Sequence, residues 1–340
     1  MEVTKSSTIY DVATAAGVSV KTVSRVLNGE NSVRLKNREK VQCAVRALDY
    51  KPDFNARRLR TKQSYLIGLL YIDYWSNSYS SRLTSGAIAA CDEAGYDLLV
   101  RPVSDKNKIT VAEHISYMTE RSNPDGYIIA PPLCDRKDLL DAIRKMGKPA
   151  VRILPWELDE RDCVYCDIVQ GVKDAIKHLI FLGHTRIGIV NITTVHGGLW
   201  RYQGYREAIE EAGLPLAEEL MYQSGSDETQ CELAIRKMLN LPDRPTAIFT
   251  FNDFFATIVY KVANQMQIKI PYDLSVIGFD DDPISQNLWP PLTTVQQPVL
   301  DLGKAAANKL IKSLIQGKTN LVPPSLNCTF VQRSSCGPRY

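Results

Sequence analysis

The chain has 340 residues, which is more than one hydrophobic core usually organises and predicts two or three domains. Its apolar content of 44% and charged content of 23% are ordinary for a globular protein, and no apolar run is long enough to span a bilayer. The first residues lack the apolar stretch of a secretory signal, so we expect a cytoplasmic protein whose eight scattered cysteines are reduced. Cys163 and Cys166 form a single C-x-x-C pair, which without a second pair of ligands does not indicate a zinc site.

The charge is unevenly divided along the chain. Residues 1–63 carry 13 Lys and Arg against 6 Asp and Glu, a net +7, whereas the other 277 residues carry 28 against 32, a net −4. A basic N-terminal segment on an acidic body is typical of a module that binds nucleic-acid phosphates and is attached to a second function.

Residues 8–29 have the pattern of two short helices joined by a tight turn. Thr8 and Asp11 form a capping box for the first helix. Gly17 supplies permissive backbone for the turn, and the Ser19 hydroxyl can cap the second helix. Apolar residues at helical spacing predict a small shared core, namely Val12, Ala16, Val18, Val23 and Val26 or Leu27.

Lys21 and Arg25 lie four residues apart, so they project from one face of the second helix. In a helix-turn-helix this face enters the major groove of DNA, where Lys and Arg read guanine edges. The alternative is an ordinary pair of amphipathic helices with a solvated basic face. The net charge of the segment favours DNA.

A third helix is predicted over residues 37–48, with Val41, Ala44, Val45 and Leu48 on its inner face, and Pro52 follows its end. The next residues, 53–62, are basic and uncapped. So short a segment cannot by itself offset the cost of helix nucleation, so in isolation it should be mostly disordered.

From Tyr65 onward, predicted strands alternate with predicted helices. Strands are expected at residues 66–72, 96–100, 126–130, 150–153, 186–190, 247–250 and 274–278, and the first helix at 79–94. This alternation predicts parallel sheets covered on both faces, in two similar lobes of about 64–163 and 164–291. Because ligands of such sheets bind at the carboxyl ends of the strands, we expect a cleft where the two lobes face each other.

Several motifs occur together in this chain in a fixed order. They are residues 9–13, 17–19, 22–28, 38–41, 50–52, 178–179, 182–184, Arg201 with Gly204 and Tyr205, 252–253, 275–281, 291–294 with Gln297, and 333–335. In this arrangement the chain resembles the LacI/GalR family of bacterial transcription regulators, and the likeness extends to about residue 335.

The resemblance implies an α/β protein with an N-terminal all-α helix-turn-helix headpiece and a two-lobed core like that of periplasmic binding proteins. It places the headpiece at 1–52 and a hinge helix at 53–63. The N-terminal lobe would comprise 64–163 and 293–327, the C-terminal lobe 164–292, and the tail 328–340.

The resemblance also implies roles at the DNA. Val20, Lys21 and Arg25 would read bases in the major groove. The DNA backbone would be held by Tyr10, Asn28, Arg34 and Asn37. In the hinge, Leu59 would be an apolar wedge in the minor groove, and Ala56 would allow two hinge helices to approach closely.

Seven residues are expected at the effector, namely Tyr79, Arg152, Trp200, Arg201, Asn252, Asp280 and Gln297. Their planar hydrogen-bonding groups and aromatic faces suit a sugar. Residues 224–227 lack the aromatic that many family members carry there, and Trp200 is the neighbouring replacement. Arg152 suggests an anionic or acetylated effector. Without the resemblance to the family, a buried Arg facing an Asp would be interpreted as a structural ion pair.

We therefore expect a homodimeric, ligand-responsive repressor of carbohydrate-utilisation genes, which leaves a pseudo-palindromic operator when a small sugar or sugar derivative binds. A dimer is preferred because the chain ends without the heptad helix of family tetramers. The alternatives are a regulator that responds to purines or another metabolite, a solute-binding protein, and activation in place of repression. No catalytic motif, metal site or cofactor motif is indicated, so we expect neither an enzyme nor a cofactor. The protein would work in the cytoplasm, on the nucleoid when bound to its operator.

Overall fold

The computed structural model describes residues 7–27, 32–50, 63–72, 77–103, 111–159, 162–192, 196–224, 227–317 and 326–339. The chain divides into two compact units, Met1–Gln63 and Ser64–Tyr340. Among the described residues, no helix is both long and apolar enough to cross a membrane.

The described residues of the first unit form three helices, α1 (Ile9–Ala16), α2 (Val20–Leu27) and α3 (Leu35–Ala47). The predicted capping box is present at Thr8 and Asp11, and Gly17 ends α1 with φ +63°. The Ser19 hydroxyl accepts a hydrogen bond from the Thr22 N–H at 3.2 Å, so the predicted cap of α2 is also confirmed. Helix α3 begins two residues before the predicted start.

The predicted core of the first unit is confirmed. Its buried members come from all three helices and are Val12, Ala13, Ala16, Val23, Val26, Val41 and Ala44. These residues are small or β-branched, which lets three short helices pack closely with few buried atoms. The basic side chains of α2 are left on the surface.

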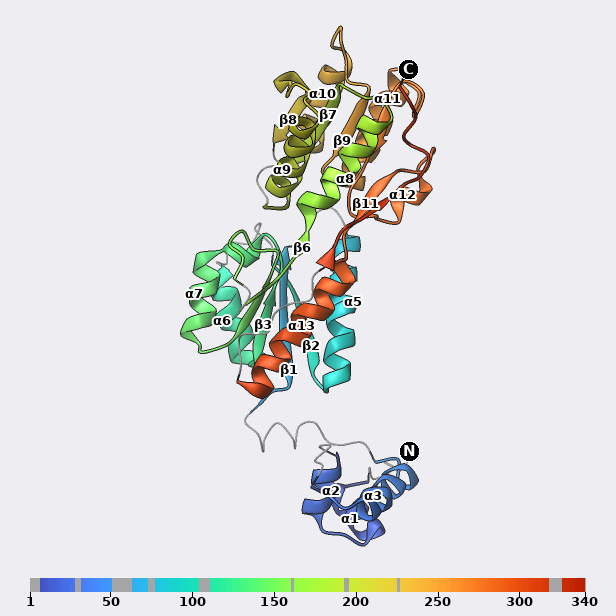
Figure 1. The fold of residues 1–340 in the computed structure, drawn as a ribbon. Helices are drawn as coiled ribbons and strands as arrows, with labels where there is room; N and C mark the ends of the chain where they lie inside the picture. Colours follow the sequence, from blue (N-terminus) through green and yellow to red (C-terminus); the bar gives the residue numbers. More distant parts are fainter. Residues whose placement is uncertain are drawn as a thin grey trace, which may run out of the picture. The chain divides into compact units, whose positions relative to one another are not determined.

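The second unit begins with a five-stranded parallel sheet. Its order is β2 (Asp97–Val103), β1 (Leu66–Ile72), β3 (Gly126–Ile129), β4 (Ala150–Ile153) and β5 (Cys163–Val164). Helices α5 (Asn77–Ala94) and α13 (Val299–Gln316) cover one face, and α6 (Val111–Ser122) and α7 (Lys137–Lys145) cover the other (Figure 1). Alternate strand residues divide between these faces, because Ile67 and Leu69 join one buried cluster while Leu70 joins another.

A four-stranded parallel sheet forms the second lobe. Its order is β10 (Ser275–Ile277), β9 (Ala247–Thr250), β7 (Ile187–Ile192) and β8 (Met221–Ser224). Helices α8 (Ile168–Phe181) and α9 (His196–Glu211) pack on one face, and α10 (Glu228–Leu239) and α11 (Asp253–Gln265) on the other. Both lobes therefore have the predicted arrangement of parallel strands with helices on both faces.

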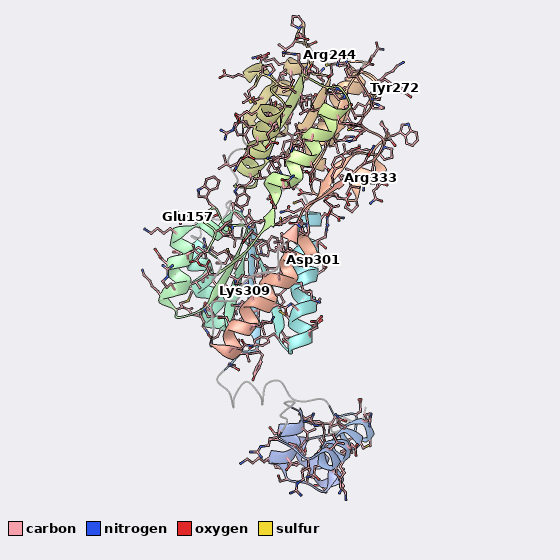
Figure 2. All side chains as sticks on the ribbon, in the orientation of Figure 1. Glu157, Arg244, Tyr272, Asp301, Lys309 and Arg333 are labelled. Carbon is pink, nitrogen blue, oxygen red and sulfur yellow. The ribbon has the colours of Figure 1, made fainter. Side chains whose placement is uncertain are left out.

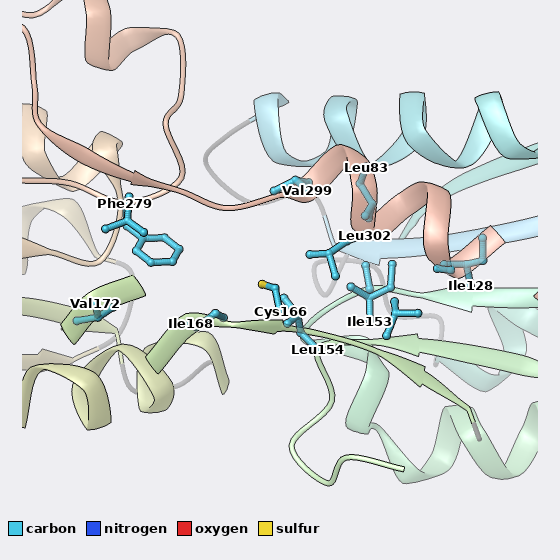
Figure 3. Close-up of a cluster of buried hydrophobic side chains, with 14 of the residues drawn as sticks. Leu83, Ile128, Ile153, Leu154, Cys166, Ile168, Val172, Phe279, Val299 and Leu302 are labelled. Atoms are coloured by element: carbon cyan, nitrogen blue, oxygen red, sulfur yellow. The ribbon is translucent and has the colours of Figure 1, made fainter. Parts of the chain in front are cut away.

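Short strands connect the two lobes. Strand β6 (Cys166–Asp167) pairs in parallel with β12 (Leu326–Asn327), and β11 (Thr294–Gln296) pairs antiparallel with β13 (Thr329–Val331). One buried apolar cluster continues through this connection, from Ile128 and Ile153 past Cys166 and Ile168 to Phe279 (Figure 3). The lobes thus share part of their core.

After β13 the chain packs against the second lobe. The Val276 N–H donates to the Ser335 carbonyl at 3.0 Å, and the Ser335 hydroxyl donates to the Val276 carbonyl at 2.6 Å. These bonds extend the edge of the four-stranded sheet at β10. The C-terminal residues are consequently fixed to the same lobe as the loop that follows β10.

Candidate functional site: a polar cluster between the lobes and a basic helix face

Polar residues follow the carboxyl ends of strands in both lobes. Tyr79 lies in α5 after β1, Arg201 in α9 after β7, Asn252 two residues after β9, Asp280 after β10 and Gln297 directly after β11. The two lobes meet at these strand ends, where Arg82 of the first lobe contacts the residues that follow β10 and β11.

Arg201 is 5% exposed, and its Nη2 lies 3.3 Å from Oδ1 of Asp280. Its guanidinium also lies over two aromatic rings, 4.3 Å from the centroid of Phe251 and 3.9 Å from that of Phe279. Both contacts hold the planar group in one orientation. A Cβ at Gly197, four residues earlier, would lie 2.6 Å from Nη1 of Arg201, so a side chain there would displace the guanidinium from this position.

Arg82, on the first lobe, holds the loop that carries Asp280. Its Nη1 donates to the carbonyls of Asp280 and Asp281 at 3.0 and 3.5 Å, and its Nη2 donates to the Gln297 carbonyl at 3.3 Å. Asp280 and Asp281 have φ of +98° and +52°, values unusual for residues with a side chain. Burial raises the pKa of Asp280, while Arg201 and Arg82 act against that rise.

Two buried polar atoms at this point have no hydrogen-bond partner among the described residues, the Tyr79 hydroxyl and Nε of Arg201. Burial is the main reason that the pKa of Tyr79 is raised, and nearby Asp280 adds to the rise. An unmade hydrogen bond of a buried group is costly, so two such atoms close together indicate a water or a ligand.

Two further predicted residues, Asn252 and Gln297, make side-chain contacts within the protein. The Asn252 side chain caps α11, since its Oδ1 accepts from the Phe255 N–H at 3.1 Å. The Gln297 side chain is buried and donates through Nε2 to the Cys166 sulfur at 3.7 Å. The structure therefore brings Tyr79, Arg201 and Asp280 together most directly.

On the first unit, α2 presents the predicted basic face. Lys21 and Arg25 are exposed, and Val20 beside them is half-buried. Arg34 is the exposed N-cap of α3 and makes no side-chain cap bond, and Asn37 lies in the first turn of α3. Tyr10 is exposed and lines a surface hollow together with Thr14, Gly17, Ser19 and Val20. Asn28, Ala56 and Leu59 lie outside the described residues.

Two family patterns match this chain. The pattern described as bacterial regulatory proteins of the lacI family matches residues 8–53, and the periplasmic binding protein-like domain matches residues 176–336. The HTH-type transcriptional regulator DegA of Bacillus subtilis is 35% identical over 87% of this chain and 88% of its own length. The chain belongs to the LacI family.

Other LacI-family proteins show comparable similarity over nearly the whole length. The ribose operon repressor of Escherichia coli is 31% identical over 91% of this chain and 94% of its own. The repressor PurR of Vibrio cholerae is 32% identical over 91% of both chains. These relatives are regulators of transcription and not enzymes, so the chain is a ligand-responsive DNA-binding regulator of the LacI type.

Solved structures agree with this assignment. The lac repressor dimer bound to operator and the anti-inducer ONPF superposes with a TM-score of 0.74, at 26% identity over 97% of this chain and 99% of that one. The complex of the regulator CelR with cellobiose gives a TM-score of 0.72, at the same identity and coverage. The predicted combination of headpiece and two-lobed core is confirmed.

Arg152, predicted at the effector, is held by acidic residues of its own lobe. Its Nε and Nη2 make a bidentate pair with Asp162 at 3.2 and 2.9 Å, and its Nη1 lies 3.7 Å from Asp135. Nη2 also donates to the Glu157 carbonyl at 3.3 Å. These contacts fix the loop after β4, a role that the sequence pattern did not indicate.

Trp200 lies in the second turn of α9, next to Arg201, and its ring stacks on that of Trp156 from the first lobe. The centroids are 6.4 Å apart and the rings are inclined by 14°. Sequence reasoning missed Trp156 and Arg82. Two signals could have found them, since Trp156 follows the end of β4 and Arg82 follows Tyr79 by one helical turn.

The eight cysteines carry free thiols in the structure. Cys166 lies near Cys328, with the sulfurs 3.9 Å apart. Among the described residues, no group of three or more His, Cys, Asp or Glu could hold a metal ion.

Proposed function

We propose that this LacI-family regulator is a repressor of carbohydrate-utilisation genes whose effector, a small sugar or sugar derivative, binds the cleft between the lobes and releases a pseudo-palindromic operator. The observation that carries the effector site is the pair of unpartnered polar atoms, the Tyr79 hydroxyl and Arg201 Nε, beside the Arg201–Asp280 ion pair. A carboxylate, a guanidinium and a phenol together supply the donors and acceptors that sugar hydroxyls need, and the aromatic ring can pack on the apolar side of the sugar.

Arg201 and Asp280 would contact the sugar hydroxyls directly, and Tyr79 would close the floor of the site. Asn252 and Gln297 would join them after a small rotation of their side chains from the contacts described above. We assign Arg152 to positioning the loop after β4, because its guanidinium is already occupied by Asp162 and Asp135. Trp200 remains an effector contact in this proposal.

The DNA-binding half rests on the exposed face of α2. Val20, Lys21 and Arg25 would read base edges, and Tyr10, Asn28, Arg34 and Asn37 would hold the DNA backbone. Ala56 and Leu59 would form the hinge contact in the minor groove. Operator-bound protein would lie on the nucleoid of the cytoplasm.

In this proposal each lobe is built around one of the two large sheets. The N-terminal lobe takes 64–163 and 293–327, because α13 packs on α5 and the first sheet. The C-terminal lobe takes 164–292, and the tail 328–340 lies on β10 through Ser335. Residues 1–52 are the headpiece and 53–63 the hinge. Closure of the lobes on the effector would change the subunit contact and separate the hinges.

The dimer contact that we propose lies on the second lobe. Tyr272 is 82% exposed and Trp289 88% exposed, and both line an open groove of about 1170 Å³ along α11. Exposed aromatics on this scale mark an interaction surface, and a two-fold operator needs a second copy of the chain. Sedimentation of Trp289→Asp should show dissociation to monomers, and a variant that remains a dimer would contradict this placement.

A purine effector is the second candidate, favoured by the 32% identity to PurR. Thermal melting of the full chain with single sugars, sugar acids, amino sugars, sugar phosphates, hypoxanthine and guanine distinguishes the two. A ligand at about a hundred times its Kd adds ~2.7 kcal/mol to the stability of the folded state. We expect one sugar class to raise Tm. A rise with a purine alone would replace the sugar, and no rise with any compound would remove the effector proposal.

A further inference from the structure

Two cysteines lie next to each other in the segments that connect the lobes. Cys166 begins β6, and Cys328 directly follows β12, the strand that pairs in parallel with β6. Their sulfurs are 3.9 Å apart, although the two residues are separated by 162 positions of the chain. Figure 3 shows Cys166 in the buried cluster that continues from one lobe to the other. The pair therefore brings together two separate connections between the lobes.

The segment that carries Cys328 passes from the first lobe to the second. Before it, α13 with Asp301 packs on the first lobe, and after it Arg333 pairs with Asp281 of the second lobe at 2.6 Å (Figure 2). Cys328 also packs against the first turn of α8, because a Cβ on Gly171 would lie 2.6 Å from the Cys328 Cβ. A rotation of one lobe relative to the other must therefore twist the chain close to Cys328.

Cys166 contacts the polar cluster between the lobes. Nε2 of Gln297 donates to its sulfur at 3.7 Å, and the Gln297 carbonyl accepts from Nη2 of Arg82 at 3.3 Å. Cys166 is buried and Cys328 is half-buried, so Cys328 is the more accessible of the two residues. Its hydrogen bond with Cys166, together with burial, raises the pKa of the Cys328 thiol. The thiolate fraction is therefore small, and the pair reacts slowly with weak oxidants.

We propose that Cys166 and Cys328 form a peroxide-sensitive redox switch, in which an intramolecular disulfide joins the two connecting segments and changes the affinity for the operator. Hydrogen peroxide is the oxidant. Its O–O bond breaks as one oxygen is transferred to the Cys328 sulfur, which gives a sulfenic acid and one water. The Cys166 sulfur then attacks the sulfenic sulfur, and the hydroxyl group leaves with the thiol proton as a second water. Two electrons pass from the sulfurs to the peroxide.

The disulfide would change the connection between the lobes. A disulfide holds its sulfurs about 2.05 Å apart, so the two sulfurs must approach each other by roughly 2 Å from their present separation. This approach takes the Cys166 sulfur away from Gln297 and restricts the twist between β6 and the segment after β12. In a ligand-responsive regulator, changes between the lobes are transmitted to the DNA-binding unit. The oxidised protein should therefore bind its operator with a different affinity.

The first test identifies the bond in the full chain. Reduced protein is treated with hydrogen peroxide, its remaining thiols are alkylated, and a digest is analysed by mass spectrometry without reduction. We expect one cross-linked pair of peptides, which joins Cys166 to Cys328 and disappears after dithiothreitol. Cys163→Ser is the matched control, because Cys163 is also buried and lies three residues before Cys166. It should retain the cross-link, whereas Cys166→Ser should lose it.

The second test measures fluorescence anisotropy on an operator selected from random duplexes, before and after peroxide. Every protein carries Cys43→Ser, so that the exposed thiol on α3 of the DNA-binding unit does not contribute. Operator affinity should change at least about fivefold on oxidation, recover with dithiothreitol, and do the same in Cys163→Ser. Cys328→Ser and Cys328→Ala should each keep the reduced affinity and Tm of the parent protein before and after peroxide. Agreement of these two variants separates loss of the thiol from a defect in packing.

Three results would overturn the inference. One is recovery of Cys166 and Cys328 as alkylated thiols from folded protein treated with peroxide. Another is a cross-link that joins two chains or a different pair of cysteines. The third is a bond between Cys166 and Cys328 that leaves operator affinity unchanged. None of these measurements uses a sugar, so their outcome is independent of the proposed effector.

Discussion

Arg201 and Asp280 form an ion pair where the two lobes meet, 3.3 Å apart, in which the buried guanidinium still has Nε free of any hydrogen bond within the described structure. A purely structural pair would be expected to satisfy all its polar atoms, since an unmade bond of a buried charged group is expensive. The ion pair is therefore formed before a ligand binds, and Nε of Arg201 can still donate a hydrogen bond to that ligand.

Arg201→Met should abolish the Tm increase caused by the active sugar and lower the stability of the free protein by ~3 kcal/mol, because Asp280 then lacks its main partner. The double variant Arg201→Met with Asp280→Asn should recover part of the stability without recovering the sugar response. Arg206→Met is the matched control, since Arg206 lies on the same helix in an exposed pair with Glu210. Melting curves with and without the sugar measure both effects, and a normal sugar response in Arg201→Met would refute the site.

Arg82→Met should weaken sugar binding about tenfold, because three carbonyls of the loops after β10 and β11 lose the donor that orients them. The loss should exceed that in Lys304→Met, which removes only an exposed pair with Glu93 on the outside of the same lobe and should change binding less than twofold. Calorimetric titration gives both values. Equal affinities in the two variants would mean that Arg82 does not position the site.

Substitutions on the first unit should separate base reading from phosphate binding. Lys21→Ala and Arg25→Ala should each weaken operator binding by ~1–3 kcal/mol and relax sequence preference, because they remove contacts to base edges. Arg34→Ala should weaken binding to all duplexes alike and reduce the slope of log affinity against log salt concentration by about one. Lys145→Ala, on α7 of the second unit, is the control. Fluorescence anisotropy with operator and scrambled duplexes at several salt concentrations measures these effects.

His184 should make the second lobe sensitive to mild acid. Its Nδ1 contacts the Thr246 hydroxyl at 2.8 Å and its Nε2 contacts the Gly337 carbonyl at 3.0 Å, while burial lowers its pKa below the usual 6.5. A lowered pKa means that the neutral ring is favoured in the folded state, so its stabilisation is present above pH 6.5 and is lost as the pH falls below that value. His184→Gln should flatten the decline of Tm between pH 7 and pH 5.5. A variant with an unchanged slope would exclude His184 as the cause.

The regular elements of this protein could be predicted because each one carries its own pattern. Val12, Val23 and Val41 recur at helical spacing, and Ile67, Leu69 and Leu70 form an apolar run of strand length. The helix ends were predictable for the same reason, since the Thr8 capping box and Gly17 act within a few residues. The connecting strands were not, because β6 and β12 have two residues each and are defined only by pairing across about 160 residues of chain.

The residues of the candidate site were likewise only partly predictable from the sequence. Arg201, Asp280 and Tyr79 could be predicted as effector contacts because they follow predicted strands and because the family resemblance implies ligand contacts at their positions. The role of Arg82 depends on carbonyls turned by the positive φ of Asp280 and Asp281, a backbone detail that no residue pattern predicts. Arg152 was placed at the effector because it lies on the strand two residues before Leu154, on the same side, where the family resemblance implies a pocket residue. The structure shows instead that Asp135 and Asp162, from separate loops, both pair with its guanidinium.

The central claim is that a sugar bound in the cleft controls the affinity for DNA. The most direct measurement is fluorescence anisotropy of the full chain on an operator selected from random duplexes, with and without the sugar that raises Tm. We predict that the sugar weakens operator binding at least about tenfold and that Arg201→Met, at the same salt concentration, binds operator with or without it, in line with a coupling of ~1–3 kcal/mol. An operator affinity that is identical with and without a sugar known to bind would contradict the account.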